Sequence, residues 1–96
     1  MHYVAICLDK VDSLQVRLAH RAAHLDFLRA NAATIKVCGP LLADDGTTMT
    51  GSLLIVDAAD RKVVDAILAQ DPYRKAGLFE SVKVRPWRWV VGEPVA

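Results

Sequence analysis

The chain has 96 residues, of which 53% are hydrophobic and 24% are charged, and its formal net charge is +1. This length and composition indicate one folded domain with enough apolar side chains for a core, and exclude a disordered chain. The nearly balanced charge argues against a general nucleic-acid or membrane-surface binder, so we expect neither among its partners.

The apolar runs and the cysteines indicate a cytoplasmic protein. Runs such as Leu53 to Val56 are far too short to span a bilayer. No charged start followed by an apolar segment indicates a signal peptide. Cys7 and Cys38 lie in apolar segments without metal-ligand spacing. We expect two buried free thiols, with a disulfide or a reactive thiol as the alternative.

The first part of the chain predicts a strand, a long helix and a second strand. Residues 2–8 are almost all apolar and β-favouring, which is typical of a strand covered on both faces. Asp12 or Ser13 can cap a helix that runs to about Asn31. A second strand is expected over residues 34–38, because Gly39 and Pro40 then interrupt the pattern.

Apolar residues recur along the predicted long helix at helical spacing, and we expect them to form its buried face. They are Leu14, Leu18, Ala22, Leu25, Leu28 and Ala32.

The second part of the chain predicts a strand, a helix and a last strand. Residues 51–57 form the third strand, and Asp60 caps the second helix. That helix must end near Asp71, because the residue before a proline avoids the α-helical region. The last strand covers residues 80–91, with Pro86 placing a kink or a sheet edge inside it.

This order of elements predicts an α+β fold of the ferredoxin-like βαββαβ type, in which an antiparallel sheet carries two helices on one face. The other face would expose alternate Val, Ile, Leu and Trp side chains, which is uncommon in a soluble monomer. We therefore expect a homodimer, a dimeric α+β barrel in which two copies pack sheet to sheet and enclose a cavity.

His24 and Asp71 are the candidate catalytic residues. His24 lies on the flank of the long helix, and Asp71 lies where the second helix must stop. A carboxylate that orients an imidazole fixes its tautomer and prepares it for proton transfer. The pair can form within one chain or across the dimer. In the structural alternative, His24 is a hydrogen-bonded boundary residue and Asp71 starts a turn.

Three further residues are candidates for substrate binding. Arg21 lies close to the apolar stripe, so its charge needs an acidic partner, an anionic ligand or an exposed head group. Ser52 is a hydrogen-bond donor to a ligand or, if a base reaches it, a nucleophile. Tyr73 is a phenol donor at the same site or a packing residue.

Metal and nucleotide sites are not expected. His20 and His24 have the i, i+4 spacing that can hold a metal, but no third ligand other than Asp71 is evident. No glycine-rich phosphate loop is present, which leaves a nucleotide cofactor unsupported. Trp87 and Trp89 share one strand face and are expected to line an interface or the barrel rather than to stack on bases.

An ordered set of short motifs spans about residue 2 to residue 90: Tyr3-Val4, Arg17-Leu18, Arg21-x-x-His24-Leu25-x-x-Leu28, Gly39-Pro40-Leu41, Gly51-Ser52, Asp71-Pro72-Tyr73-x-x-Ala76-Gly77-Leu78-Phe79 and Val82-x-Val84-x-Pro86. In this order and spacing the set resembles the YciI-related (YCII domain) family. The chain departs from relatives in the short loop between Leu42 and Thr50, where they often carry a longer insertion.

The resemblance implies a single YCII-like domain over residues 1–96 and a dimeric α+β barrel. It also implies an active site whose histidine and aspartate match His24 and Asp71, with Ser52 nearby. A characterised branch of the family resembles dehydrochlorinases that act on chlorinated hydroxyhydroquinones, with the His–Asp pair handling the proton. No cofactor is required for such chemistry.

Two functional hypotheses follow. The first is a cofactor-independent lyase or isomerase in which His24 is the general base and Asp71 orients it. Arg21 or Ser52 then contacts an anionic or polar substrate group, and Tyr73 makes a lesser contact. The second is a non-catalytic dimeric module that binds a small molecule or stabilises a partner, with the same His–Asp pair serving structure.

Overall fold

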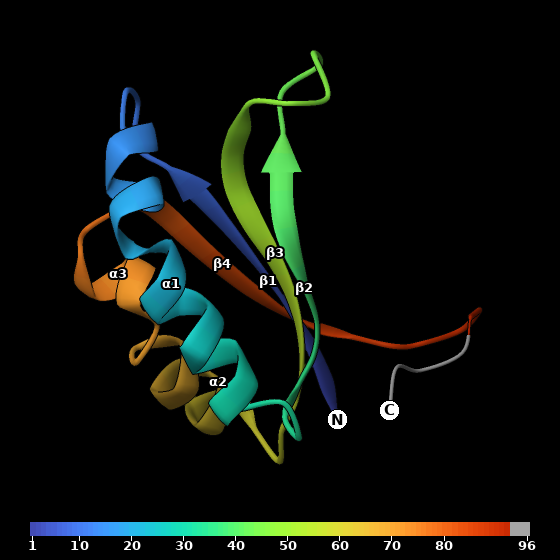
Figure 1. The fold of residues 1–96 in the computed structure, drawn as a ribbon. Helices are drawn as coiled ribbons and strands as arrows, with labels where there is room; N and C mark the ends of the chain where they lie inside the picture. Colours follow the sequence, from blue (N-terminus) through green and yellow to red (C-terminus); the bar gives the residue numbers. More distant parts are fainter. Residues whose placement is uncertain (93–96) are drawn as a thin grey trace.

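The computed structural model describes residues 1–92, and Figure 1 shows a sheet with the helices on one face. The elements within this range are β1 (His2–Asp9), α1 (Leu14–Ala30), β2 (Ile35–Leu42), β3 (Met49–Asp57), α2 (Arg61–Leu68), α3 (Pro72–Lys75) and β4 (Phe79–Trp87). The strands lie in the order β2-β3-β1-β4, and every neighbouring pair is antiparallel. The predicted ferredoxin-like fold is confirmed, with the short α3 as an addition. The predicted domain range also included residues 93–96, which lie outside the described residues.

Both edge strands differ in length from the prediction. β2 continues through Gly39 and Pro40 to Leu42, whereas the sequence suggested an end at residue 38. β4 ends at Trp87 rather than at residue 91, so Trp89 lies beyond the strand. Proline lacks an N–H to donate, and an edge strand tolerates it because one side of the strand has no partner. Gly39 and Pro40 therefore did not break β2.

The core lies between the sheet and the helices. Tyr3, Ala5 and Cys7 alternate along β1 towards the helices and are all buried. Leu54 and Val56 of β3 are fully buried on the same face. Residues of α2 and of the segment after α3 complete the core: Val64, Leu68 and Leu78. Cys7 is buried and Cys38 half-buried, and both are free thiols.

The prediction for the buried face of α1 was wrong for most of the apolar stripe, although Leu28 is half-buried against the core. Leu14 and Leu18 are 41% and 48% exposed, while Arg17, His24 and Phe27 are the buried residues of this helix. Arg17 and His24 turn inward because each contacts a buried carboxylate on another element. Helical spacing predicts an apolar stripe on α1. The contacts with distant carboxylates determine which flank of the helix packs against the rest of the protein.

The helix ends follow the capping pattern only in part. Asp60 caps α2, and its side chain accepts a hydrogen bond from the backbone N–H of Val63 at 3.1 Å. Ser13 occupies the N-cap of α1, but its hydroxyl donates to Val11 and makes no cap hydrogen bond. α1 therefore owes its position to packing and to its buried polar contacts rather than to its cap.

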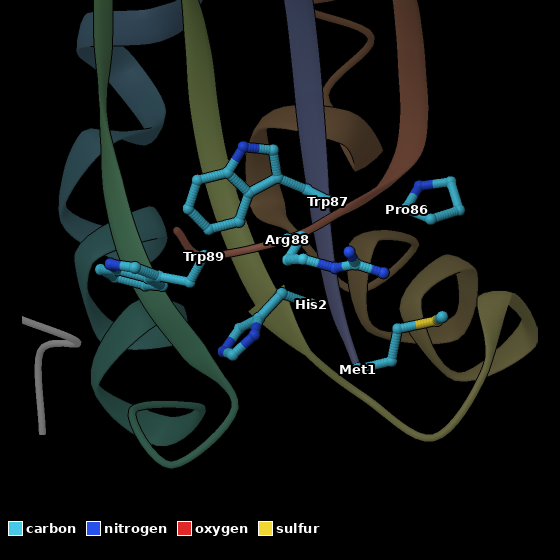
Figure 2. A pocket seen from close by; sticks show the side chains of 6 residues that line it. All are labelled: Met1, His2, Pro86, Trp87, Arg88 and Trp89. Carbon is cyan, nitrogen blue, oxygen red and sulfur yellow. The ribbon is translucent and has the colours of Figure 1, made fainter. Parts of the chain in front are cut away.

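The face of the sheet away from the helices carries exposed apolar side chains together with Lys83 and Arg85, which pair with Ile6 and Val4. Ile6 and Leu8 of β1 are 39% and 44% exposed, and Trp87 of β4 is 38% exposed. Figure 2 shows His2, Trp87 and Trp89 gathered on one side of the sheet, and the two indole rings lie 5.2 Å apart. The predicted bare face is therefore present with Trp87 on it, whereas Trp89 lies beyond the end of β4. Within residues 1–92, no helix has the length and apolar character needed to cross a bilayer.

Candidate functional site

His24 and Asp71 form a hydrogen-bonded pair within one chain. His24 lies on the buried flank of α1, and Nδ1 of its ring is 2.9 Å from Oδ1 of Asp71. The two side chains are only 7% and 2% exposed. The structure thus brings together, inside a single subunit, two residues that are 47 positions apart in the sequence.

Asp71 is held in place by the start of α3. It is the N-cap residue of this short helix, and Pro72 follows it at the first helical position, where a proline is favoured. The same Oδ1 that contacts His24 also accepts the backbone N–H of Tyr73 at 2.9 Å. The carboxylate of Asp71 therefore caps the start of α3 and also contacts the imidazole of His24.

The contacts of His24 determine which nitrogen of its ring is the donor to Asp71. A carboxylate oxygen accepts hydrogen bonds, so Nδ1 of His24 is assigned as the donor to Asp71 and Nε2 is the ring nitrogen outside this contact. The ring also stacks on Tyr73, with the centroids 4.0 Å apart and the planes at 17°. Two contacts fix the orientation of the imidazole, and Nε2 is left for a ligand.

A second polar cluster, which the sequence did not predict, lies beside the pair. Arg17 of α1 donates to both carboxylate oxygens of Asp9 at the end of β1, through Nε and Nη2, each at 2.8 Å. Nη2 also donates to Oγ of Ser52 at 3.0 Å. The Arg17 and Asp9 side chains are 3% and 7% exposed, so this bidentate ion pair is buried.

The electrostatics of this cluster keep Arg17 charged. Burial alone lowers the pKa of Arg17, but its hydrogen bond and charge attraction to Asp9 outweigh burial and raise the pKa overall. The guanidinium carbon Cζ also lies 4.7 Å from the centre of the Tyr73 ring. Burial raises the pKa of the Tyr73 phenol, with Arg17 opposing the rise, so the phenol stays protonated at neutral pH.

A cavity of about 150 Å³ lies beside these groups, on the helix-covered side of the sheet. It is lined from α1, β2, β3 and α3 by Arg17, Arg21, His24, Leu25, Leu28, Cys38, Gly39, Pro40, Met49, Ser52 and Tyr73. Four of the five predicted site residues therefore line one cavity, and the fifth, Asp71, lies behind His24. This cavity is formed within one chain, whereas the sequence suggested a cavity enclosed by two sheets.

The geometry also bears on the other candidate residues. Ser52 is hydrogen-bonded to Arg17, which donates and cannot act as a base, so the contact does not activate the serine as a nucleophile. Arg21 lines the cavity while remaining exposed. His20 is exposed, and residues 1–92 contain no group of three or more His, Cys, Asp or Glu side chains placed to hold a metal ion.

Arg17 and Asp9 are the site residues that sequence reasoning missed. A signal for Arg17 was present, because it precedes His24 by seven residues and therefore lies on the same flank two turns earlier. Asp9 is the first charged residue after the apolar run of β1. No periodicity connects them, and only the packing of α1 across the end of β1 brings them together.

Comparison with known proteins finds relatives that match nearly the whole chain. A family model for the YCII-related domain matches residues 1–88. Protein YciI of Escherichia coli O6:H1 is 35% identical over 97 residues, which cover 94% of this chain and 99% of that protein. An uncharacterized protein of Haemophilus influenzae is 31% identical over 97 residues, again covering 94% of this chain and 99% of that protein.

Solved structures extend the comparison to an enzyme. The 5-chloro-2-hydroxyhydroquinone dehydrochlorinase TftG from Burkholderia phenoliruptrix AC1100, in complex with 2,5-dihydroxybenzoquinone, is 39% identical, with a TM-score of 0.83 over 92% of this chain and 94% of that chain. An antibiotic biosynthesis monooxygenase is 11% identical with a TM-score of 0.57 over 94% of this chain and 98% of that chain, so it shares the fold alone. Because a family model matches nearly the whole chain and the curated relatives span it almost end to end, the protein belongs to the YCII-related domain family.

Proposed function

We propose that this protein is a cofactor-independent lyase for a small ring-shaped substrate, with His24 as the proton-transferring residue. The observation that carries the proposal is the 2.9 Å contact between His24 Nδ1 and Asp71 Oδ1 at the wall of a cavity. Asp71 orients the ring and stabilises the imidazolium that forms when Nε2 accepts a proton. Such a pair supplies acid–base chemistry without a bound cofactor.

The size of the cavity supports a single-ring substrate. A volume of about 150 Å³ is similar to that of engineered apolar cavities that bind benzene. Apolar and aromatic side chains also line this cavity: Leu25, Leu28, Pro40, Met49 and Tyr73. A planar ring held there has its edge within reach of the imidazole.

The likeness to TftG supports loss of hydrogen chloride as the reaction class. In such an elimination one hydroxyl proton moves to the ring carbon that carries chlorine, a second hydroxyl proton is lost to the base, and chloride leaves with the electron pair of the broken C–Cl bond. His24 Nε2 accepts the proton, and the net products are the dechlorinated quinone and HCl. This elimination needs no oxidant or reductant. It needs a base, and the proposal assigns that role to His24.

Chloride release tests the proposal directly. Purified protein is incubated with 5-chloro-2-hydroxyhydroquinone under anaerobic conditions, and free chloride is measured over time. We expect turnover by the native protein and a loss of about a hundredfold or more in kcat for His24→Gln, the scale of one positioned acid–base group. The matched control is His20→Gln, because His20 is an exposed histidine one turn earlier on the same helix.

The outcomes separate the enzyme from a binding module. Full turnover in His24→Gln removes the proton-transfer role. Tight binding of the hydroxyhydroquinone by native protein that releases no chloride from it favours the non-catalytic alternative, in which the His–Asp pair serves structure.

We also propose that the working form is a homodimer that pairs through the bare face of the sheet. Support comes from the exposed apolar residues of β1 and β4, Ile6, Leu8 and Trp87, since an exposed apolar patch with a polar rim is typical of a protein–protein contact. The cavity lies on the opposite side of the sheet, so dimerisation leaves its lining within each subunit.

A further inference from the structure

A second pocket lies where β1 begins and β4 ends, and it shares no lining residue with the cavity beside His24. Its volume is about 560 Å³, which is within the usual range of small-molecule sites. We call it the tryptophan pocket, and its lining residues are Met1, His2, Pro86, Trp87, Arg88 and Trp89. Nothing in the proposed lyase reaction uses this pocket.

Three aromatic rings pack against one another in the tryptophan pocket. The ring of His2 lies 6.3 Å from that of Trp87 and 5.6 Å from that of Trp89, and the two indoles are 5.2 Å apart. All three pairs meet edge to face, at interplanar angles of 66° to 85°, which is a favoured arrangement of aromatic rings. The rings therefore hold one another in place, and the aromatic part of the pocket is formed without a ligand.

The end of β4 brings a cation into the same pocket. In a continuous strand, Trp87 and Trp89 would share one face and Arg88 would point to the other. β4 ends at Trp87, however, and Arg88 lines the pocket together with both indoles. Figure 2 shows the Arg88 side chain extending towards Met1 and Pro86, with the indoles on the other side. The pocket thus has an aromatic side and a cationic side.

The charges around the pocket favour an anionic ligand group. None of its lining residues is acidic, and Asp57, which pairs with His2 across β3 and β1, does not line it. Arg88 is exposed and is absent from the ion pairs formed among residues 1–92. Aromatic rings alone attract cations, but Arg88 would repel a cation, whereas its guanidinium can donate two parallel hydrogen bonds to a carboxylate.

The geometry points to a binding site for a planar aromatic carboxylate, with its ring against Trp87 and Trp89 and its carboxylate at Arg88. The site binds this ligand without chemical change. It does not depend on the proposed lyase activity, because none of its residues lies in the cavity of His24.

The site is compatible with the proposed homodimer. His2 pairs with Trp87 at one end of the β1–β4 ladder, whereas Leu8 pairs with Ser81 towards the other end. A second copy centred on Ile6 and Leu8 would therefore have the tryptophan pocket at the margin of its contact. Coverage of the pocket by that second copy is one outcome of the test below.

The experiment uses tryptophan fluorescence, because the chain has two tryptophans and both line this pocket. The probe is 4-nitrobenzoate, a ring that quenches indole emission, and its uncharged analogue is 4-nitrobenzamide. N-acetyltryptophanamide corrects for absorption of light by the probes. An exposed charge pair contributes less than a buried one, so we expect saturable quenching by both probes and roughly three- to tenfold tighter binding of the carboxylate.

Three variants separate the local contact from general charge and from the ring contact. Arg88→Gln should lose the preference for the carboxylate while still binding both probes. The matched control is Arg85→Gln, which removes the same charge from an exposed arginine of β4 outside the pocket and should keep the preference. Trp89→Leu should weaken both probes to a similar extent, with Trp87 remaining as the reporter.

Each of four results would overturn the inference. Quenching that does not saturate would mean that no site is present, and an unchanged preference in Arg88→Gln would remove the carboxylate contact. Tighter binding of benzyltrimethylammonium than of 4-nitrobenzoate would identify a cation site. Emission that changes with protein concentration, without saturable quenching, would show that a second copy covers the pocket. Chloride release is measured separately, so failure of the lyase proposal leaves this test unaffected.

Discussion

At the scale of single residues, Asp71 shows how one carboxylate oxygen makes two contacts at once. Its Oδ1 accepts from the backbone N–H of Tyr73 and contacts His24 Nδ1, both at 2.9 Å. The first contact starts α3, and the second orients the imidazole. An amide at this position keeps an acceptor for both donors but removes the negative charge that stabilises an imidazolium.

The Asp71→Asn variant should therefore lose activity more than stability. We expect kcat for chloride release to fall roughly 10–100-fold, the scale on which carboxylates that orient metal-binding histidines contribute. The melting temperature should fall by less than in Asp71→Ala, which removes the helix cap as well. Equal losses of activity and stability in the two variants would assign Asp71 to structure alone.

The two thiols are a second residue-scale test, because burial raises the pKa of Cys7 to about 12 and that of Cys38 to about 11. Only the thiolate reacts with iodoacetamide, so both cysteines should be alkylated at least roughly a hundredfold more slowly than a free cysteine at about pH 8. The rate should rise as the pH approaches the raised pKa values, since the thiolate fraction grows with pH. Mass spectrometry of native and urea-unfolded protein measures both rates, and rapid labelling of native Cys38 at neutral pH would contradict the expectation.

At the scale of elements, the close approach of β1 and β3 depends on Gly51. A Cβ added to Gly51 would lie 2.3 Å from the backbone oxygen of Cys7, a distance that the strand pair cannot accept without separating. Gly51 pairs with Leu8, and its neighbour Ser52 pairs with Cys7, so this contact also fixes where the Ser52 hydroxyl lies.

Gly51→Ala should therefore destabilise the fold by about 1–3 kcal/mol or more, the usual cost of overpacking a well-packed site. The matched control is Gly39→Ala in β2, because a Cβ there meets no atom within 4 Å. Denaturant unfolding of both variants measures the difference. Equal stability in the two would mean that the β1–β3 pair has more freedom than the structure shows.

At the scale of the whole molecule, the uncovered sheet face predicts association. Sedimentation at micromolar concentration should give about twice the 10.5 kDa mass of the chain. Ile6→Glu places a charge on the bare face at a residue that is 39% exposed, and it should shift the protein towards monomer because the charge would be buried in the interface. The control is Val63→Glu on α2, where the residue is 40% exposed on the helical side.

The outcome for the two variants locates the interface. A dimer that survives Ile6→Glu and dissociates in Val63→Glu would place the contact on the helices instead. A native protein that sediments as a folded monomer would remove the proposed pairing, but the cavity lining, which lies within one chain, would be unaffected.

The sequence by itself determined the order of the elements and the identity of the His–Asp pair. Alternation and helical spacing are local signals, and Asp71 before Pro72 marks a helix boundary by its own backbone preferences. The motif set, by its resemblance to a family, added the expectation that His24 and Asp71 belong to one site. These features were readable because each depends on neighbours in the chain or on an ordered pattern.

Only the tertiary structure decided which flank of α1 is buried, where the cavity lies, and that Arg17, Asp9 and Ser52 form one cluster. The contacts that make these decisions join residues 8, 35 and 47 positions apart. Helical spacing favoured the stripe with Leu14 and Leu18, but a buried charge is stable where it finds a partner, and the partners of Arg17 and His24 lie on other elements. Local periodicity carries no information about such partners, because their positions follow from how the helix crosses the sheet.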